Sequence, residues 1–268
     1  MKGDYMLRQL ENILREASSI MLSARPEGIT SKEGHANFVT EADRQTQDFL
    51  QEKLAALLPG SALFGEEKEN EPLGEGPTWV VDPIDGTLNY IHGLMHSAIA
   101  AALVLDRQVT LCAVYNPYRD EMFTAEKGGG ARLNGQPIHA ADNPFERALT
   151  FYGTSPYQPA LVDATFKAVA ALMRQTADVR RFGSAILDLA YIACGRADIF
   201  FEYSLSPWDY TAGKLLVEEA GGVFQLLNLT NEKLDYSKPA AVFAANPVSA
   251  QKALALIERE YRAREGRQ

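Results

Sequence analysis

The feature that most constrains this chain is an apolar run that ends in two carboxylates, Asp82 and Asp85. The run from Thr78 to Val81 is β-branched and aromatic, which predicts a buried strand. Pro83 fixes φ between the two acids, and Gly86 permits a backbone conformation that a side chain would block. Two carboxylates held at the end of a buried strand repel each other unless a cation lies between them. The motif therefore predicts a metal site.

The type of metal follows from the ligand atoms, whereas the number of ligands stays open. Oxygen ligands suit Mg²⁺, Mn²⁺ or Ca²⁺ rather than Zn²⁺, which prefers His and Cys. Glu66 and Glu67 end a second strand-like run, and Asp209 directly precedes a helix predicted over residues 210–220. Each acid also has a purely structural interpretation, because the two glutamates fit an acidic loop and Asp209 fits a helix N-cap. A strand that simply ends in two solvated acids fits the first motif as well.

Length, charge and cysteine content limit the class of protein. A chain of 268 residues with 46% hydrophobic and 23% charged residues is typical of a globular protein with a sizeable core. The net charge of −9 disfavours a nucleic-acid-binding surface. Two cysteines and an N-terminus without a signal-peptide pattern predict reduced thiols and a cytoplasmic location. The four histidines share no spacing, so zinc and histidine-based nucleophilic catalysis are not expected.

The hydrophobic pattern changes near the middle of the chain. Two amphipathic helical patterns come first, and strand-like segments follow over residues 78–125. From residue 148 onward strands alternate with helices. We therefore divide the chain into an N-terminal α+β half, 1–143, and a C-terminal α/β half, 144–268. The run Lys127–Gly130 lacks the Lys-Ser/Thr pair and helix of a phosphate loop, and we interpret it as a hairpin turn.

Four segments resemble motifs of the inositol monophosphatase family, which comprises Mg²⁺-dependent, lithium-sensitive phosphatases. The two long segments are Trp79–Tyr90, WVVDPIDGTLNY, and Trp208–Gly222, WDYTAGKLLVEEAGG. The two short ones are Gly65-Glu66-Glu67 and Thr40-Glu41-Ala42-Asp43. All four occur in the family's order across most of the chain. The resemblance implies an α+β fold, a layered α-β-α-β-α sandwich of the sugar phosphatase and inositol monophosphatase type.

The resemblance also implies a metal centre with two or three Mg²⁺ ions, with Mn²⁺ as a possible substitute and Ca²⁺ or Li⁺ as inhibitors. Glu66, Asp82 and the backbone carbonyl of Ile84 would hold the ion that lowers the pKa of the attacking water. Asp82, Asp85 and Asp209 would hold the second ion, and both would neutralise the phosphoryl and leaving oxygens. For the side chain of Ile84 we expect simple packing.

The catalytic residues that the resemblance implies are Thr87, Asp43 and Glu66. Thr87 and Asp43 would orient the attacking water, although Asp43 also fits a capping box with Thr40 at the start of a helix. Glu67 lies beside a ligand and would support it from outside the metal shell. Lys32 matches a lysine on the metal-binding loop of the family, and a solvated loop lysine fits the same position.

The implied substrate-binding residues are Gly86, Thr87, Gly183, Ser184, Ala185, Glu202 and Asp209. The backbone N–H groups of Gly86 and Thr87 would face the phosphate at a helix start. The other residues lie where the family contacts the sugar or cyclitol ring. Ser184 is also a natural N-cap, and Glu202 fits a surface acid. Arg180 and Arg181 could assist an anionic substrate or form a solvated strand end.

These motifs together predict Mg²⁺-dependent hydrolysis of a small phosphate monoester, first of all inositol monophosphate, by metal-activated water. Fructose-1,6-bisphosphatase, histidinol-phosphatase and 3′-nucleotidase activities are alternatives at the same site. The last is disfavoured because Leu88-Asn89-Tyr90 stands where those enzymes usually have Lys-Glu-Phe. A non-catalytic regulatory or RNA-associated protein is the alternative from a different class, disfavoured by the intact acidic set. The expected partners are a small phosphorylated polyol or sugar and a second copy of the chain, with no nucleic acid and no membrane.

Overall fold

The computed structural model describes residues 2–23, 29–31, 38–68, 70, 74, 76–227 and 238–263. Lys32, which the resemblance places on a metal-binding loop, lies outside the described residues. Cys112 and Cys194 are both free, as predicted. None of the helices in these described ranges is long and apolar enough to cross a bilayer.

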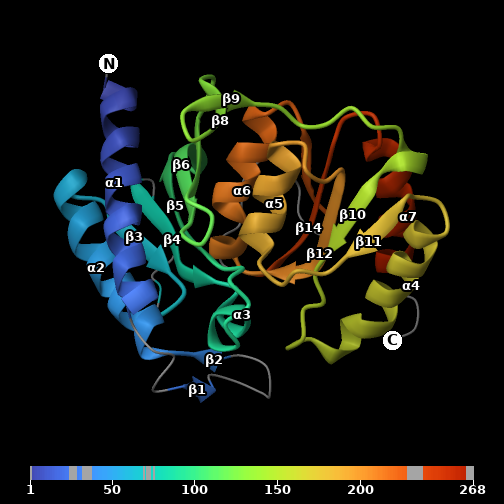
Figure 1. Cartoon of the computed structure of the whole chain (residues 1–268), viewed down its shortest axis with the longest axis horizontal. Helices are drawn as coiled ribbons and strands as arrows, with labels where there is room; N and C mark the ends of the chain where they lie inside the picture. Colours follow the sequence, from blue (N-terminus) through green and yellow to red (C-terminus); the bar gives the residue numbers. More distant parts are fainter. Residues whose placement is uncertain are drawn as a thin grey trace.

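The chain folds into five layers, helix, sheet, helix, sheet, helix, so the predicted α+β sandwich is confirmed (Figure 1). Two helices cover the outer face of the first sheet, two lie between the sheets, and two cover the outer face of the second sheet. In that order they are α1 (Lys2–Ser23), α2 (Glu41–Leu57), α5 (Ala185–Ala193), α6 (Pro207–Glu219), α4 (Val162–Met173) and α7 (Ala250–Arg262). The amphipathic pattern of α1 explains its place, because Leu10, Leu14 and Met21 are fully buried on one face.

The first sheet has seven strands that neighbour one another in chain order. They are β3 (Ala62–Gly65), β4 (Thr78–Asp85), β5 (Ala98–Leu105), β6 (Gln108–Asn116), β7 (Glu121–Glu126), β8 (Gly130–Leu133) and β9 (Gln136–Ile138). β3 pairs parallel to β4, and the remaining pairs are antiparallel. The predicted hairpin turn joins β7 to β8, and the short helix α3 (Thr87–Ile91) lies between β4 and β5.

Among the described residues, the second sheet has five strands in the order β11-β10-β12-β14-β13. They are β10 (Leu149–Tyr152), β11 (Asp178–Arg180), β12 (Ile199–Leu205), β13 (Val223–Leu226) and β14 (Ala240–Ala245). β10 pairs parallel to both of its neighbours, and β14 pairs antiparallel to both of its own. The smaller elements are β1 (Thr30–Ser31), β2 (Phe38–Val39) and the 3₁₀ turns Phe145–Arg147 and Pro159–Leu161.

The boundary placed at residues 143 and 144 falls in the connection between β9 and β10, and hence between the two sheets. Helices α5 and α6 contact strands of both sheets. One buried cluster accordingly contains Val114 of β6, Leu216 of α6 and Val242 of β14. Because both halves share this core, their division into two units stays a prediction.

Two element boundaries were predicted wrongly, and both lie at the site. The strand predicted over residues 78–81 continues to Asp85, because β5 goes on pairing with it past Pro83. The helix predicted over residues 210–220 begins at Pro207, where proline is well suited to the first helical turn. Asp209 therefore lies inside the helix rather than at its N-cap.

Candidate active site

A register shift in β4 brings its two acids to the same side of the sheet. Asp82 pairs with Ala100 and Asp85 pairs with Ala98, so three steps along β4 match two along β5. In a regular strand, residues three apart point to opposite faces, and one extra residue removes that difference. The N–H of Ile84 donates to Oδ1 of Asp82 at 3.0 Å, which holds the bulged segment.

The chain then turns sharply at Gly86, where φ is +81°. A Cβ atom at this position would lie 3.1 Å from the carbonyl oxygens of Gly183 and His96. Both the left-handed backbone and the close approach of two other segments therefore require glycine. The turn ends β4 and begins α3 at Thr87, so the predicted helix start next to the two acids is confirmed.

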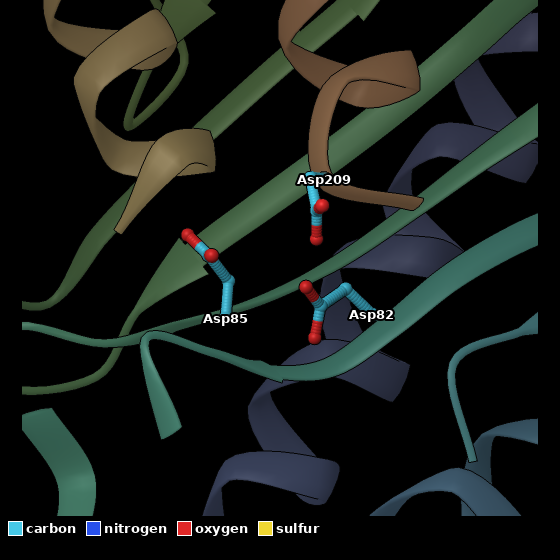
Figure 2. Close-up of side chains that lie close together, drawn as sticks. All are labelled: Asp82, Asp85 and Asp209. Atoms are coloured by element: carbon cyan, nitrogen blue, oxygen red, sulfur yellow. The ribbon is translucent and has the colours of Figure 1, made fainter. Parts of the chain in front are cut away.

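Three carboxylates from distant segments meet beside this turn. Asp82, Asp85 and Asp209 each place one oxygen so that these atoms lie within 4.8 Å of one another. Figure 2 shows Asp209 pointing from α6 toward Asp82, with Asp85 beside them. Asp209 occupies the third position of α6, where its Oδ2 accepts the N–H of Ser206 at 2.7 Å. We call these three residues the acidic group.

Burial makes the negative charges of the acidic group difficult to keep. Asp82 is 1% exposed and Asp85 is 7% exposed. Burial, followed by the negative charge of Glu66, raises the pKa of Asp82 and of Asp209 well above the usual range. Burial also raises the pKa of Asp85 to about 6, although hydrogen bonds from Ser184 and from backbone N–H groups oppose that rise. The ionised state of the group therefore requires compensating positive charge.

Protein side chains do not supply this compensation in the described part of the chain. None of its ion pairs involves a member of the acidic group. The donor atoms are all carboxylate oxygens, which are the ligands of Mg²⁺ and similar hard cations. The residues thus fit a divalent metal ion.

Glu66 and Ile84 lie at the same pocket. Both line it, although Glu66 is not one of the three acids whose oxygens meet. Gly65, at the end of β3, is held by the side chain of Asn70. This side chain accepts a hydrogen bond from the N–H of Gly65 at 2.9 Å and donates one to its carbonyl oxygen at 2.8 Å. The Ile84 side chain is fully buried, as expected for packing. The backbone N–H of Glu67 donates to Oε1 of Gln47 at 2.8 Å, which links this turn to α2.

Asp43 and Thr87, which were both expected to orient the attacking water, contact each other. Oγ1 of Thr87 lies 3.4 Å from Oδ1 of Asp43 and 3.1 Å from the carbonyl oxygen of Ile84. Oδ2 of the fully buried Asp43 accepts the N–H of Thr40 at 2.7 Å, which confirms the capping box at the start of α2. One carboxylate therefore caps a helix with one oxygen and contacts Thr87 with the other.

The loop that begins α5 contacts Asp85. Ser184 is fully buried and caps α5, as the structural interpretation predicted, and its hydroxyl donates to Oδ2 of Asp85. The same oxygen accepts the N–H of Ile186 at 2.9 Å. Gly183, Ser184 and Ala185 all line the pocket. The hydroxyl of Ser184 thus fixes the orientation of Asp85.

Glu202 is buried in the pocket wall, so its interpretation as a surface acid was wrong. Its carboxylate accepts the N–H of Ser155 at 2.7 Å and the hydroxyl of Ser155 at 3.1 Å. Burial raises the pKa of Glu202 to about 7. A Cβ at position 153 would lie 1.7 Å from Oε2 of Glu202, so Gly153 makes room for this carboxylate.

The pocket, of about 130 Å³, is also lined by residues that the sequence analysis did not assign to it. These are Leu88, Gly153, Pro156, Tyr157, Asp188 and Leu205. Arg181, for which a solvated strand end was an alternative, lines the pocket too. Asp188 had a detectable signal, because it is the only charged residue in the apolar helical run AILDLAYIA. Tyr157 and Gly153 carried no such signal.

Comparison with known proteins agrees with this geometry. The model of the inositol monophosphatase family matches residues 4–262. The chain belongs to this family. An inositol-1-monophosphatase of Rhizobium meliloti is 40% identical over 194 residues, which cover 72% of this chain and 73% of the relative. A relative named Nus factor SuhB, from Xylella fastidiosa, is 39% identical over 190 residues, which cover 69% and 68%.

Solved structures of family members share the whole fold. The extragenic suppressor protein SuhB of Bartonella henselae superposes with a TM-score of 0.85 at 30% identity, covering 96% of this chain and 98% of that one. An inositol monophosphatase of Thermotoga maritima gives a TM-score of 0.84 at 28% identity, covering 95% and 97%. The names of these relatives thus include both inositol monophosphatases and SuhB proteins.

Proposed function

We propose that the chain is a Mg²⁺-dependent phosphatase that hydrolyses the monoester of a small phosphorylated polyol, inositol monophosphate first of all. The observation that carries this proposal is the acidic group, two buried carboxylates and the half-buried Asp209, which lack a basic side-chain partner among the described residues. Membership of the inositol monophosphatase family supports it. So does the relative named inositol-1-monophosphatase at 40% identity.

The proposed metal ligands are Glu66, Asp82, Asp85, Asp209 and the carbonyl oxygen of Ile84, for two or three Mg²⁺ ions. When bound, the ions would lower the pKa of a water molecule and offset negative charge on the phosphoryl and leaving oxygens. The fixed orientation of Asp85, held by Ser184 and Ile186, limits the reorganisation that binding requires.

Asp43 and Thr87 are proposed to position the attacking water. The Thr87 hydroxyl donates one hydrogen bond, to Asp43 or to the carbonyl oxygen of Ile84, and its lone pairs would then accept a hydrogen bond from the water. The buried capping box with Thr40 keeps Asp43 from turning away. The backbone N–H groups of Gly86 and Thr87 are proposed to face the phosphate.

The other end of the pocket is proposed to bind the polyol. Glu202 would accept hydrogen bonds from ring hydroxyls, with Ser155 holding its carboxylate in place. Gly183 and Ala185 would contact the ring, and Ser184 would act through Asp85. The small volume of the pocket favours a compact substrate.

A regulatory, non-catalytic role is the second candidate, because several relatives carry the name Nus factor SuhB. We further propose that the chain acts in the cytoplasm. We also propose that it forms a homodimer, which light scattering of the purified protein can test. The acidic group favours the enzymatic role, since closely spaced carboxylates without positive partners destabilise a protein that does not use them.

Phosphate release from a panel of esters tests the proposed function. The panel contains inositol 1-phosphate, fructose 1,6-bisphosphate, histidinol phosphate and a nucleoside 3′-phosphate, each with and without Mg²⁺. We expect Mg²⁺-dependent turnover, fastest with inositol 1-phosphate. A faster reaction with another ester would change the substrate but keep the phosphatase. No turnover with any of them would overturn the proposal in favour of the regulatory role.

A further inference from the structure

One acid of the pocket has no function so far. Asp188 lies on α5, one turn after Ser184, and it lines the pocket although it is only 2% exposed. Its Oδ1 atom is buried and has no hydrogen-bond partner in the described part of the chain. A buried polar atom without a partner costs about 1–3 kcal/mol of stability, more for a charged group. Such a cost is typical of a residue kept for binding.

The neighbouring acids differ from Asp188 in this respect. Asp85 accepts hydrogen bonds from Ser184 and Ile186, and Glu202 accepts two from Ser155. Asp188 does not belong to the acidic group whose oxygens meet. Oδ1 of Asp188 can therefore still accept a hydrogen bond, and the proposed metal site does not use this residue.

The surroundings of Asp188 indicate which ligand chemistry suits it. Burial, together with the negative charges of Asp85 and Glu202, raises its pKa well above the usual range, and Arg181 opposes that rise. An ionised carboxylate accepts a hydrogen bond from a hydroxyl, and a protonated carboxyl group both donates and accepts one, so a hydroxyl suits either state. An ammonium group would instead need an ionised partner, and the nearby Arg181 would repel it.

We propose that Asp188 determines specificity by hydrogen-bonding a hydroxyl group of the substrate's polyol. This inference rests on the proposed phosphatase function and names a chemical requirement of its substrate, a free hydroxyl within reach of Asp188. A phosphate monoester without hydroxyl groups would leave Oδ1 of Asp188 without a hydrogen-bond partner. Sites built to hydrogen-bond a hydroxyl discriminate strongly against analogues that lack it.

The test compares two substrates and two substitutions. The substrates are inositol 1-phosphate and 4-nitrophenyl phosphate, which has no hydroxyl on its ring. Asp188→Ala removes the hydrogen-bonding group, and Asp188→Asn keeps its shape and its ability to donate and accept. Asp163→Ala changes an exposed acid on α4 and serves as the matched control.

We expect Asp188→Ala to lower kcat/KM for inositol 1-phosphate at least about tenfold and to change that for 4-nitrophenyl phosphate less than about twofold. Asp188→Asn should recover most of the selectivity, and Asp163→Ala should leave it unchanged. The unfolding temperature of both Asp188 variants should equal or exceed that of the wild type, because an unpartnered buried acid has been removed. An unfolding temperature that does not fall would show that Asp188 serves substrate binding and not the stability of the fold.

An equal loss for both substrates, or an unchanged ratio of their kcat/KM values, would overturn the role of Asp188 while the enzyme itself remains active. A wild-type protein that turns over neither ester would overturn the phosphatase function, and the role of Asp188 with it. The two failures are therefore distinguishable by the wild-type measurement alone.

Discussion

Two kinds of acidic side chain in this molecule are held in opposite ways. Asp198, just before β12, is 3% exposed, and it accepts hydrogen bonds from the N–H of Leu149 at 2.8 Å and from Nδ2 of Asn246 at 2.7 Å. Nδ2 of Asn143 donates to it as well, at 3.1 Å. The acidic group of Asp82, Asp85 and Asp209 instead places carboxylate oxygens against one another.

The difference shows how to tell a structural acid from a functional one. Asp198 ties the connection after β9 to the starts of β10 and β12, and neutral donors from the protein satisfy its carboxylate. In the acidic group, hydrogen bonds to Asp85 and Asp209 leave the mutual repulsion of three charges in place. Burial alone therefore does not mark a site; burial without enough compensation does.

The largest effect is expected from Asp82→Asn. Asp82 is the acid proposed to contact both metal ions, so the change should lower kcat at least about 100-fold. Phosphate release at saturating Mg²⁺ measures it. The matched control is Asp106→Asn, an exposed acid in the turn between β5 and β6, which should keep wild-type turnover. A wild-type kcat in Asp82→Asn would show that the acidic group, like Asp198, has no part in catalysis.

Asp198→Ala should lower the stability of the protein and leave its turnover almost unchanged. Removing the carboxylate leaves the N–H of Leu149 without its acceptor and takes from the Asn246 amide the nearer of its two acceptors, which should lower the free energy of unfolding by about 2–4 kcal/mol. The kcat of the folded fraction should stay within about twofold of the wild type. Urea denaturation and phosphate release measure the two quantities. A large loss of kcat without a loss of stability would show that Asp198 is not a purely structural acid.

The smallest effect is expected from lithium. Li⁺ at millimolar concentration should lower turnover to about half if it competes with Mg²⁺ for the acidic group. It should leave the urea midpoint unchanged, because the carboxylate of Asp198 already has its hydrogen-bond donors. KCl at equal ionic strength is the control. Turnover that is insensitive to Li⁺ would contradict the resemblance at the second metal position and would leave phosphatase activity standing.

The sequence predicted the layered fold and the segments that form the site, because each motif is local and chemically distinctive. Asp82, Asp85 and Gly86 lie within one short stretch, and the capping box of Thr40 and Asp43 follows directly from residue type. These features depend on the backbone of a few neighbouring residues.

The features that the sequence analysis missed or predicted wrongly depend on contacts between distant segments. Pairing with β5 extends β4 past Pro83, and no local pattern contains that partner. The hydrogen bond from Ser184 to Asp85 likewise joins residues 99 positions apart. Asp188 was not assigned to the site, although a lone acid in an apolar helical run indicates a pocket.

The most direct measurement is the unfolding temperature with and without Mg²⁺ at two pH values. Burial raises the folded-state pKa of Asp85 to about 6, and burial together with the charges of neighbouring acids raises those of Asp82 and Asp209 well above the usual range. Acids with raised pKa values favour folding below their unfolded pKa of about 4, and this contribution is lost as the pH rises through the folded values. The metal-free protein should therefore lose stability toward pH 8, where Mg²⁺ should restore it.

With Mg²⁺ at about 100 times its Kd, we expect the wild-type unfolding temperature to rise by about 5 °C at pH 8 and by much less at pH 5. Asp82→Asn should lose most of the rise at pH 8, and Asp106→Asn should keep it. The same rise in Asp82→Asn and in the wild type, or no rise at pH 8, would show that the three carboxylates do not bind a divalent cation.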